Sequence, residues 1–166
     1  MPNTIQKKHD ANPWQWLGLA GVMILLDQLS KITCRAWLAK VTSYEAIPGF
    51  FKLSLYYNTG AAFSFLSHET GWQIYLFAAL AIIMAIWLIR GIWRGYFVGM
   101  MSMSAALILG GAIGNLIDRC LYGYVTDFLV FYYQQYTFPA FNLADSCITL
   151  GALGFLINRP ATLKRS

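Results

Sequence analysis

Two long uncharged segments constrain this chain more than any other feature. Residues 71–89 and 95–117 contain no Asp, Glu, Lys or Arg, and about 20 mostly apolar residues are enough to span a bilayer. Charged residues make up only 11% of the chain, against about 25% in an ordinary soluble domain. Because so few charges cannot cover a water-facing surface, the sequence predicts an integral membrane protein.

Two further apolar segments reach spanning length only if each includes an acidic residue. Residues 11–26 are uncharged and run into Asp27, and residues 146–158 are uncharged and follow Asp145. We therefore predict an all-α membrane protein with four transmembrane helices and a small extracytoplasmic β/loop subdomain, as one domain over residues 1–166. The expected helices cover roughly residues 14–37, 71–93, 96–117 and 140–158, and the expected outer loops roughly residues 38–70 and 118–139.

The distribution of charge predicts the orientation of these helices. The net charge is +5, but the basic residues lie at the ends of the apolar segments and form no long cluster, so we expect no binding to nucleic acid. Both tails and the turn at 90–95 carry basic residues, which the positive-inside rule puts in the cytoplasm. Of the acidic residues, only Asp10 would share that side. Carboxylate chemistry is therefore expected at the outer face.

The first apolar segment and the two outer regions have features of their own. Lys7 and Lys8 precede the first segment as in a signal peptide, but no small-residue cleavage site follows, so we expect a retained helix. Residues 50–58, FFKLSLYYN, alternate partly and are rich in aromatic side chains. They predict a short strand or an aromatic, lid-like segment over the site. Residues 118–140 are also aromatic, as suits a membrane interface.

Several kinds of site are disfavoured by the residues that are scarce. The only histidines, His9 and His68, fall in a tail and a polar loop, which argues against a Ser-His-Asp triad. The cysteines are odd in number and have no CxxC spacing, so we expect separate thiols, with a Cys34–Cys120 bridge left open. We also expect no metal site and no cofactor.

Asp127 and Asp145 are both acidic residues embedded among apolar neighbours. Asp127 lies in VTDF and Asp145 in FNLADS, and both belong to the outer end. Two carboxyl groups close together in such surroundings would share one proton, which permits one to activate water while the other protonates a carbonyl oxygen. A structural interpretation stays open for Asp145, because Asn142 and Asp145 also have the spacing of a helix capping box.

Two other polar groups admit both structural and functional interpretations. Asp27 and Lys31 are four residues apart on one predicted helix face, which favours an ion pair at the membrane boundary. Asn115 and Asp118 share a face at the end of the third helix, next to Arg119. Asp118 and Arg119 could serve only as an interfacial anchor, or Asn115 and Arg119 could hold a substrate carbonyl.

Five motifs in order resemble the lipoprotein signal peptidases, or signal peptidase II, a family of bacterial membrane aspartic proteases. They are DQLSK (27–31), NTGAAFS (58–64), GGAIGNLIDR (110–119), VTDF (125–128) and FNLAD (141–145). The resemblance covers essentially the whole chain, and Thr126 stands where the family often has valine. It implies a catalytic pair, substrate-binding residues and supporting residues. These are Asp127 and Asp145 for catalysis; Asn58, Asn115, Arg119 and Asn142 for substrate binding; and Asp27, Lys31, Gly60 and Asp118 for support.

The resemblance also implies a substrate and a place in the cell. The expected enzyme is an aspartic endopeptidase that cuts the signal peptide from a prolipoprotein, just before a cysteine that carries diacylglycerol. It would work as a monomer among the lipids of the bacterial inner membrane, with both termini cytoplasmic and the active site at the periplasmic face. Two other classes compete: a metal-dependent lipid or phosphoryl-transfer enzyme that uses the aspartates, and a transporter with a proton relay.

Overall fold

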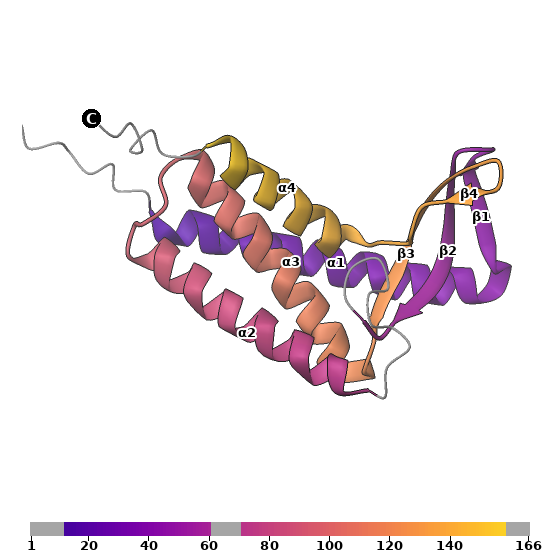
Figure 1. Cartoon of the computed structure of the whole chain (residues 1–166), viewed down its shortest axis with the longest axis horizontal. Helices are drawn as coiled ribbons and strands as arrows, with labels where there is room; N and C mark the ends of the chain where they lie inside the picture. Colours follow the sequence, from indigo (N-terminus) through magenta and orange to yellow (C-terminus); the bar gives the residue numbers. More distant parts are fainter. Residues whose placement is uncertain (1–11, 61–70, 159–166) are drawn as a thin grey trace, which may run out of the picture.

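A computed structural model describes residues 12–60 and 71–158, and it shows a helical bundle with a small antiparallel sheet at one end (Figure 1). The secondary-structure elements follow one another along the chain as helix, two strands, two helices, two strands and a final helix. They are α1 (Pro13–Val41), β1 (Ser43–Ile47), β2 (Phe51–Asn58), α2 (Trp72–Trp93), α3 (Met100–Tyr122), β3 (Val125–Tyr133), β4 (Tyr136–Thr137) and α4 (Leu143–Ile157).

Within residues 12–60 and 71–158, three helices are long and apolar enough to cross a membrane, namely α1, α2 and α3. The fourth, α4, is apolar but has only 15 residues. It lies against α3, and its end at Ile157 is at the same end of the bundle as the start of α1, away from the sheet (Figure 1). The described residues thus form a mostly helical membrane protein with three candidate membrane spans and a short fourth helix in the same bundle.

The helix boundaries differ from those expected, for reasons of backbone conformation. α3 begins at Met100 and not near 96, because Gly95 and Gly99 have positive φ values of 66° and 57° in the turn before it. α1 continues past residue 37 to Val41, and α3 past 117 to Tyr122, where Gly123 ends it in the left-handed conformation. Asp118 and Arg119, expected in the outer loop, therefore lie in the last turns of α3.

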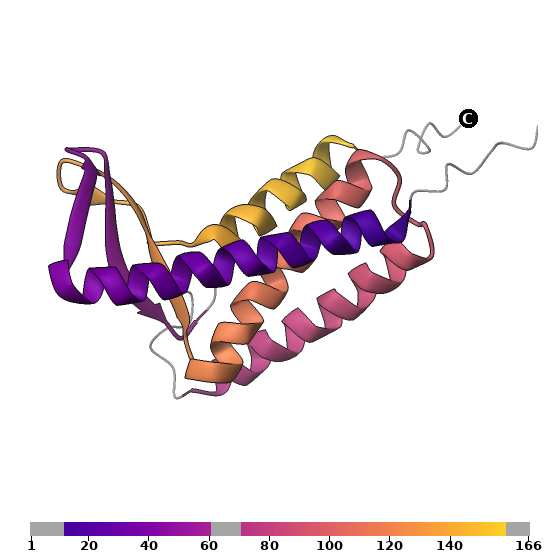
Figure 2. The same cartoon turned by 180° about the vertical axis from the view of Figure 1, so that it is seen from behind.

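Small residues let α3 pack closely against its neighbours. A Cβ added to Gly110 would lie 2.7 Å from Met23 Cβ of α1, and one added to Gly111 would collide with the carbonyl oxygen of Ala144 in α4. Close approach of this kind is the usual way in which helices associate in membranes, where apolar burial against lipid offers little driving force. Figure 2, which views the bundle from behind, shows α1 in front of the other helices and running toward the sheet.

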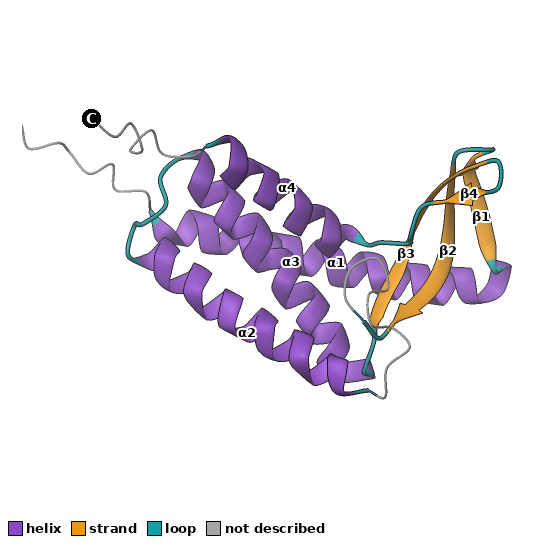
Figure 3. Ribbon diagram, in the orientation of Figure 1, coloured by secondary structure: helices purple, strands orange, loops and turns teal. Residues whose placement is uncertain are grey.

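The predicted outer subdomain is a four-stranded antiparallel sheet in the order β1-β2-β3-β4 (Figure 3). The segment expected as a strand or lid forms β2, which pairs with β1 on one side and β3 on the other. The aromatic residues of the second outer region form β3, and an isolated bridge between Leu129 and Phe141 ties β3 to the chain just before α4. The sheet thereby brings β2, β3 and the start of α4 together.

Candidate active site

Asp127 and Asn58 come together through the register of the sheet. Asn58 of β2 lies opposite Val125 of β3, and Asp127 is two residues further along β3, so the two side chains share a face of the sheet. Asn58 Nδ2 donates to Asp127 Oδ2 at 3.1 Å. Asp127 is 2% exposed, although it belongs to the outer region of the chain. The strand therefore delivers a buried carboxyl group to the end of the helical bundle.

Asp145 occupies the first turn of α4. The Asn142 side chain accepts from the backbone N–H of Asp145 at 2.9 Å, and the Asn142 backbone N–H donates to Asp145 Oδ2 at 3.3 Å. This is the capping box that the sequence predicted, and it is confirmed. The second carboxylate oxygen, Oδ1, accepts from Asn115 Nδ2 at 2.8 Å. Capping uses one edge of the carboxylate and leaves Asp145 on the wall of a cleft.

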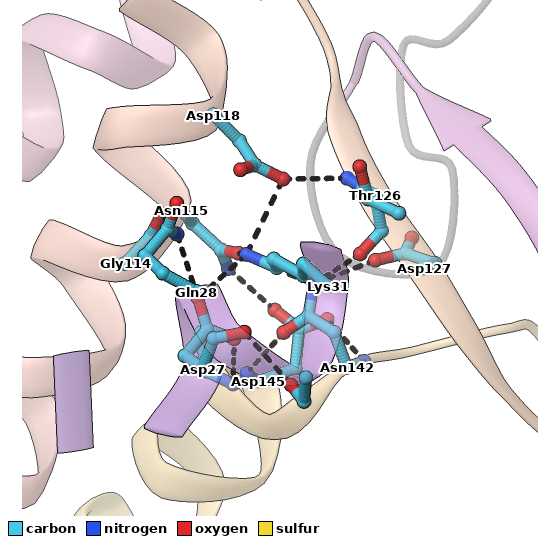
Figure 4. A network of polar contacts seen from close by, with 12 residues as sticks. Asp27, Gln28, Lys31, Gly114, Asn115, Asp118, Thr126, Asp127, Asn142 and Asp145 are labelled. Atoms are coloured by element: carbon cyan, nitrogen blue, oxygen red, sulfur yellow. Dashed lines mark hydrogen bonds and ion pairs between the residues drawn. The ribbon is translucent and has the colours of Figure 1, made fainter. Parts of the chain in front are cut away.

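Asn142 connects the two aspartates directly. Its Nδ2 donates to Asp127 Oδ1 at 2.7 Å, while its backbone N–H contacts Asp145 (Figure 4). Asn142 Nδ2 also lies 3.2 Å from Asn115 Oδ1, and Asn142 is fully buried. A single residue thus holds one carboxyl group from β3 and one from α4, which are 18 positions apart in the sequence.

The charge of Asp145 and the burial of the site act on Asp127. Burial, followed by the negative charge of Asp145, raises the pKa of Asp127 to about 7, against the opposing hydrogen bonds from Asn58 and Asn142 and the charge of Lys31. A carboxyl group whose pKa lies near neutral pH is present there in both its protonated and its ionised form. The group can therefore donate or accept a proton there.

A buried ion cluster lies next to the two aspartates (Figure 4). Lys31 Nζ is 2.8 Å from Asp27 Oδ2 and 3.4 Å from Asp118 Oδ2, and it donates to Asn115 Oδ1 at 2.9 Å. The predicted i,i+4 pair of Asp27 and Lys31 is confirmed. Asp118 is fully buried and pairs with Lys31. Asn115 is thus held by the cluster on one side and holds Asp145 on the other.

Asp27 and Asp118 also anchor backbone at the two catalytic candidates. The backbone N–H of Ala144, next to Asp145, donates to Asp27 Oδ1 at 2.9 Å. The backbone N–H of Thr126, next to Asp127, donates to Asp118 Oδ2 at 2.8 Å. Each supporting carboxylate therefore fixes the residue that precedes one member of the aspartate pair.

Arg35 and Thr126 belong to this site, and the sequence interpretation missed Arg35 and gave Thr126 no role. Arg35 Nη1 donates to Thr126 Oγ1 at 2.8 Å and is 3.8 Å from Asp118 Oδ1. Arg35 also stacks over the ring of Tyr122, 4.4 Å from its centroid. A signal was present, because Asp27, Lys31 and Arg35 repeat at four-residue intervals and so follow one face of α1.

A cleft of about 250 Å³ lies beside Asp145, between α2, α3, α4 and the sheet. Arg119 enters it from α3, where its Nη2 donates to the carbonyl oxygen of Gly60 at 2.8 Å. Gly60 N–H donates in turn to Asn58 Oδ1 at 2.9 Å, so Asn58 and Gly60 form a tight turn at the cleft. Ala61 and Ala62, expected beside Gly60, lie outside the described residues. The cleft is lined by Asn58, Phe77, Ala81, Met84, Ile108, Ala112, Asn115, Arg119, Val125, Asp145 and Ile148.

The cysteines and histidines considered in the sequence can now be compared with the structure. Cys34, Cys120 and Cys147 are all free, so the expected separate thiols are confirmed. Within residues 12–60 and 71–158, no three side chains of His, Cys, Asp or Glu are grouped as a metal site would require. His9 and His68 lie outside the described residues.

Comparison with known proteins shows the family to which the chain belongs. The family described as signal peptidase (SPase) II matches residues 19–159. The chain belongs to the signal peptidase II family. A lipoprotein signal peptidase from Chromobacterium violaceum is 47% identical over 86% of this chain and 89% of that protein. One from Paraburkholderia phymatum is 48% identical over 92% of this chain and 91% of that protein.

Solved structures are consistent with signal peptidase II membership. A bacterial membrane enzyme structure obtained by the in meso method at 2.3 Å resolution is similar, with a TM-score of 0.72 and 32% identity over 86% of this chain and 85% of that one. A second, at 1.9 Å, has a TM-score of 0.70 and 30% identity over 92% and 94% of the two chains. In this signal peptidase II chain, the contacts described above join every predicted site residue into one network.

Proposed function

We propose that Asp127 and Asp145 are the catalytic pair of this enzyme. As a signal peptidase II, the chain is an aspartic peptidase that removes the signal peptide from prolipoproteins. The observation that carries the residue assignment is Asn142, which donates through its side chain to Asp127 and through its backbone to Asp145. Two carboxyl groups held this way in a buried site share one proton.

A shared proton supplies both halves of peptide hydrolysis. The ionised carboxylate takes a proton from water, and the resulting hydroxide attacks the carbonyl carbon of the scissile bond. The protonated partner gives its proton to the carbonyl oxygen, which avoids an unprotected oxyanion. When the C–N bond breaks, the leaving amine takes the remaining proton from the pair. A hydroxyl group of the tetrahedral intermediate gives its proton back to the pair as the new C=O bond forms, so the pair again holds one proton. No covalent intermediate with the enzyme forms.

The polar residues of the cleft are suited to hold the peptide. Arg119 Nε is buried and has no hydrogen-bond partner within residues 12–60 and 71–158, yet the side chain lines the cleft beside Asp145. A buried donor without a partner is costly, and a substrate carbonyl oxygen in the cleft would satisfy it. We assign Arg119, Asn58 and Asn115 to substrate binding, and Asp27, Lys31 and Asp118 to positioning the pair and its partners.

The position of the site suits a lipid-anchored substrate. The pair lies where the bundle meets the sheet, so a cysteine that carries diacylglycerol would present its peptide bond there while its acyl chains stay in the bilayer. We propose that α4 is the fourth crossing, although its 15 residues extend only about 22 Å against about 30 Å of hydrocarbon. Both termini would then be cytoplasmic and the sheet periplasmic, in the bacterial inner membrane. A monomer suffices, because one chain supplies the whole network.

Cleavage by the purified enzyme tests this assignment. With a diacylglyceryl-modified prolipoprotein and EDTA present, we expect release of the signal peptide on a gel. Asp127→Asn and Asp145→Asn should each lower the rate by at least about 10²-fold, the usual contribution of a proton-transfer group. Glu45→Gln, which alters an exposed acid on β1, is the matched control and should cleave normally. Activity that requires magnesium, or that survives either aspartate substitution, would overturn the pair.

A further inference from the structure

We propose that a second groove beside Asp145 receives an acyl chain of the lipidated cysteine, an inference that rests on the proposed function. This groove, which we call the acyl groove, has a volume of about 400 Å³. It shares Asp145 and Ile148 with the cleft described above but extends in a different direction, over the linker before α4 and the exposed side of α4. Its remaining walls are Phe138, Phe141, Ser146, Thr149 and Leu150.

The two depressions differ in the chemistry of their walls. The cleft contains the amide and guanidinium groups of Asn58, Asn115 and Arg119, which can pair with peptide carbonyl oxygens. Among the described residues, the walls of the acyl groove contain no cation and no amide side chain, and their only polar side chains besides Asp145 are two hydroxyl groups. One of them, Ser146 Oγ, already donates to the carbonyl oxygen of Asn142 at 3.0 Å. A peptide backbone would leave its own polar groups unpaired there, whereas a hydrocarbon chain would not.

The acyl groove also opens toward the bilayer. Leu150 is 60% exposed and Phe138 is 50% exposed, and both lie on the outside of the bundle, where lipid tails would surround α4. A chain could therefore enter sideways without leaving the hydrocarbon. The aromatic side chains of Phe138 and Phe141 contact each other in a T-shaped arrangement and form the end of the groove nearest the sheet.

The substrate has the same forked shape as this pair of depressions. At the scissile bond, the signal peptide leaves along the backbone and the diacylglyceryl group leaves from the cysteine side chain. The cleft and the acyl groove meet at Asp145 and Ile148, so each branch has a separate path from the catalytic carboxylate. Because lipid tails are about as apolar as the groove itself, the groove contributes position more than affinity. It would select for a lipidated cysteine by fixing the scissile bond next to the aspartates.

Filling the acyl groove tests the proposal. Thr149→Trp places a large ring in the groove, and Leu153→Trp, one turn further along the same exposed face of α4, is the matched control. For a dipalmitoylglyceryl prolipoprotein, we expect Thr149→Trp to lower kcat/KM by about tenfold or more, as misplacement of a reacting group does. Leu153→Trp should stay within about twofold. A diacetylglyceryl substrate, whose acyl groups end at the mouth of the groove, should be cleaved equally by Thr149→Trp and the unmodified enzyme.

The outcomes separate this proposal from the proposed function. If the unmodified enzyme cleaves the dipalmitoyl substrate but both tryptophan variants act alike on it, or Thr149→Trp affects both substrates equally, the acyl groove is wrong and the catalytic pair is untouched. If the unmodified enzyme cleaves neither substrate, the proposed function itself fails.

Photocrosslinking gives a measurement that does not depend on turnover. A diazirine in the first half of the palmitoyl chain, bound to the Asp127→Asn variant, should label residues 146–150. Labelling of Phe77 or Met84 instead would put the acyl chain in the cleft and overturn the proposal.

Discussion

Replacing Lys31 tests whether the ion cluster next to the two aspartates stabilises the site. Lys31 is completely buried, with its ammonium 2.8 Å from Asp27 and 3.4 Å from Asp118. At an effective dielectric constant of about 20, these distances correspond to attractions of roughly 6 and 5 kcal/mol before the cost of desolvation. In Lys31→Met, Asp27 loses this cation, and among the described residues Arg35, at 3.8 Å, is the cation that remains paired with Asp118.

We expect Lys31→Met to destabilise the protein by about 3–5 kcal/mol, the usual cost when one member of a buried pair is removed. Equilibrium unfolding in mixed micelles measures this free energy. Lys40→Met, which removes an exposed lysine from the last turn of the same helix, should change it by less than about 0.5 kcal/mol. The double variant Asp27→Asn/Lys31→Met should lose less than the sum of its single variants, by about 0.5–3 kcal/mol, because the uncompensated charge of Asp27 is gone.

Activity supplies a second measurement on the same variant. Asn115 would lose its hydrogen bond from Lys31 and with it the support for its own bond to Asp145, so the folded fraction of Lys31→Met should cleave more slowly. The reasoning is refuted if Lys31→Met is no less stable than Lys40→Met, or if the single losses simply add in the double variant.

Three further predictions concern pH, helix packing and the strand. Folding raises the pKa of Asp127 to about 7, so the stability from binding this proton is fully present below about pH 4 and is lost as the pH rises through about 7. The value of kcat/KM should likewise fall above pH 7. A flat kcat/KM profile from pH 6 to 9 would exclude Asp127 as the group that titrates. Gly111→Ala should lower the free energy of unfolding by about 1–3 kcal/mol and slow cleavage, because the added methyl group collides with Ala144. The control Gly18→Ala, with open space around the added methyl group, should not destabilise the protein. Equal effects of the two substitutions would refute the packing argument. Thr126→Val removes the acceptor for Arg35 and should cost about 1 kcal/mol in the same unfolding measurement, while a gain in stability would show that this hydrogen bond contributes nothing.

The sequence alone identified the membrane class and the residues with chemistry. Long uncharged segments need no tertiary information to interpret, because bilayer thickness fixes their length. Contacts between residues near in sequence were equally predictable. The Asp27–Lys31 pair and the capping box at Asn142 follow from helix geometry, and both are present. The ends of the helices were less predictable, because glycines with positive φ, and not hydropathy, decided where α3 begins and ends.

Only the tertiary structure decided how the distant acids meet. The sequence suggested that Asp127 and Asp145 act together, but spacing along a chain does not set distance in space. Their common contact with Asn142 depends on the register of β2 and β3 and on the bridge from Leu129 to Phe141. The contact of Arg35 with Thr126 likewise needs α1 to pass β3. Such contacts arise from packing between elements far apart in sequence. A local pattern of residues does not show which distant side chains this packing will bring together.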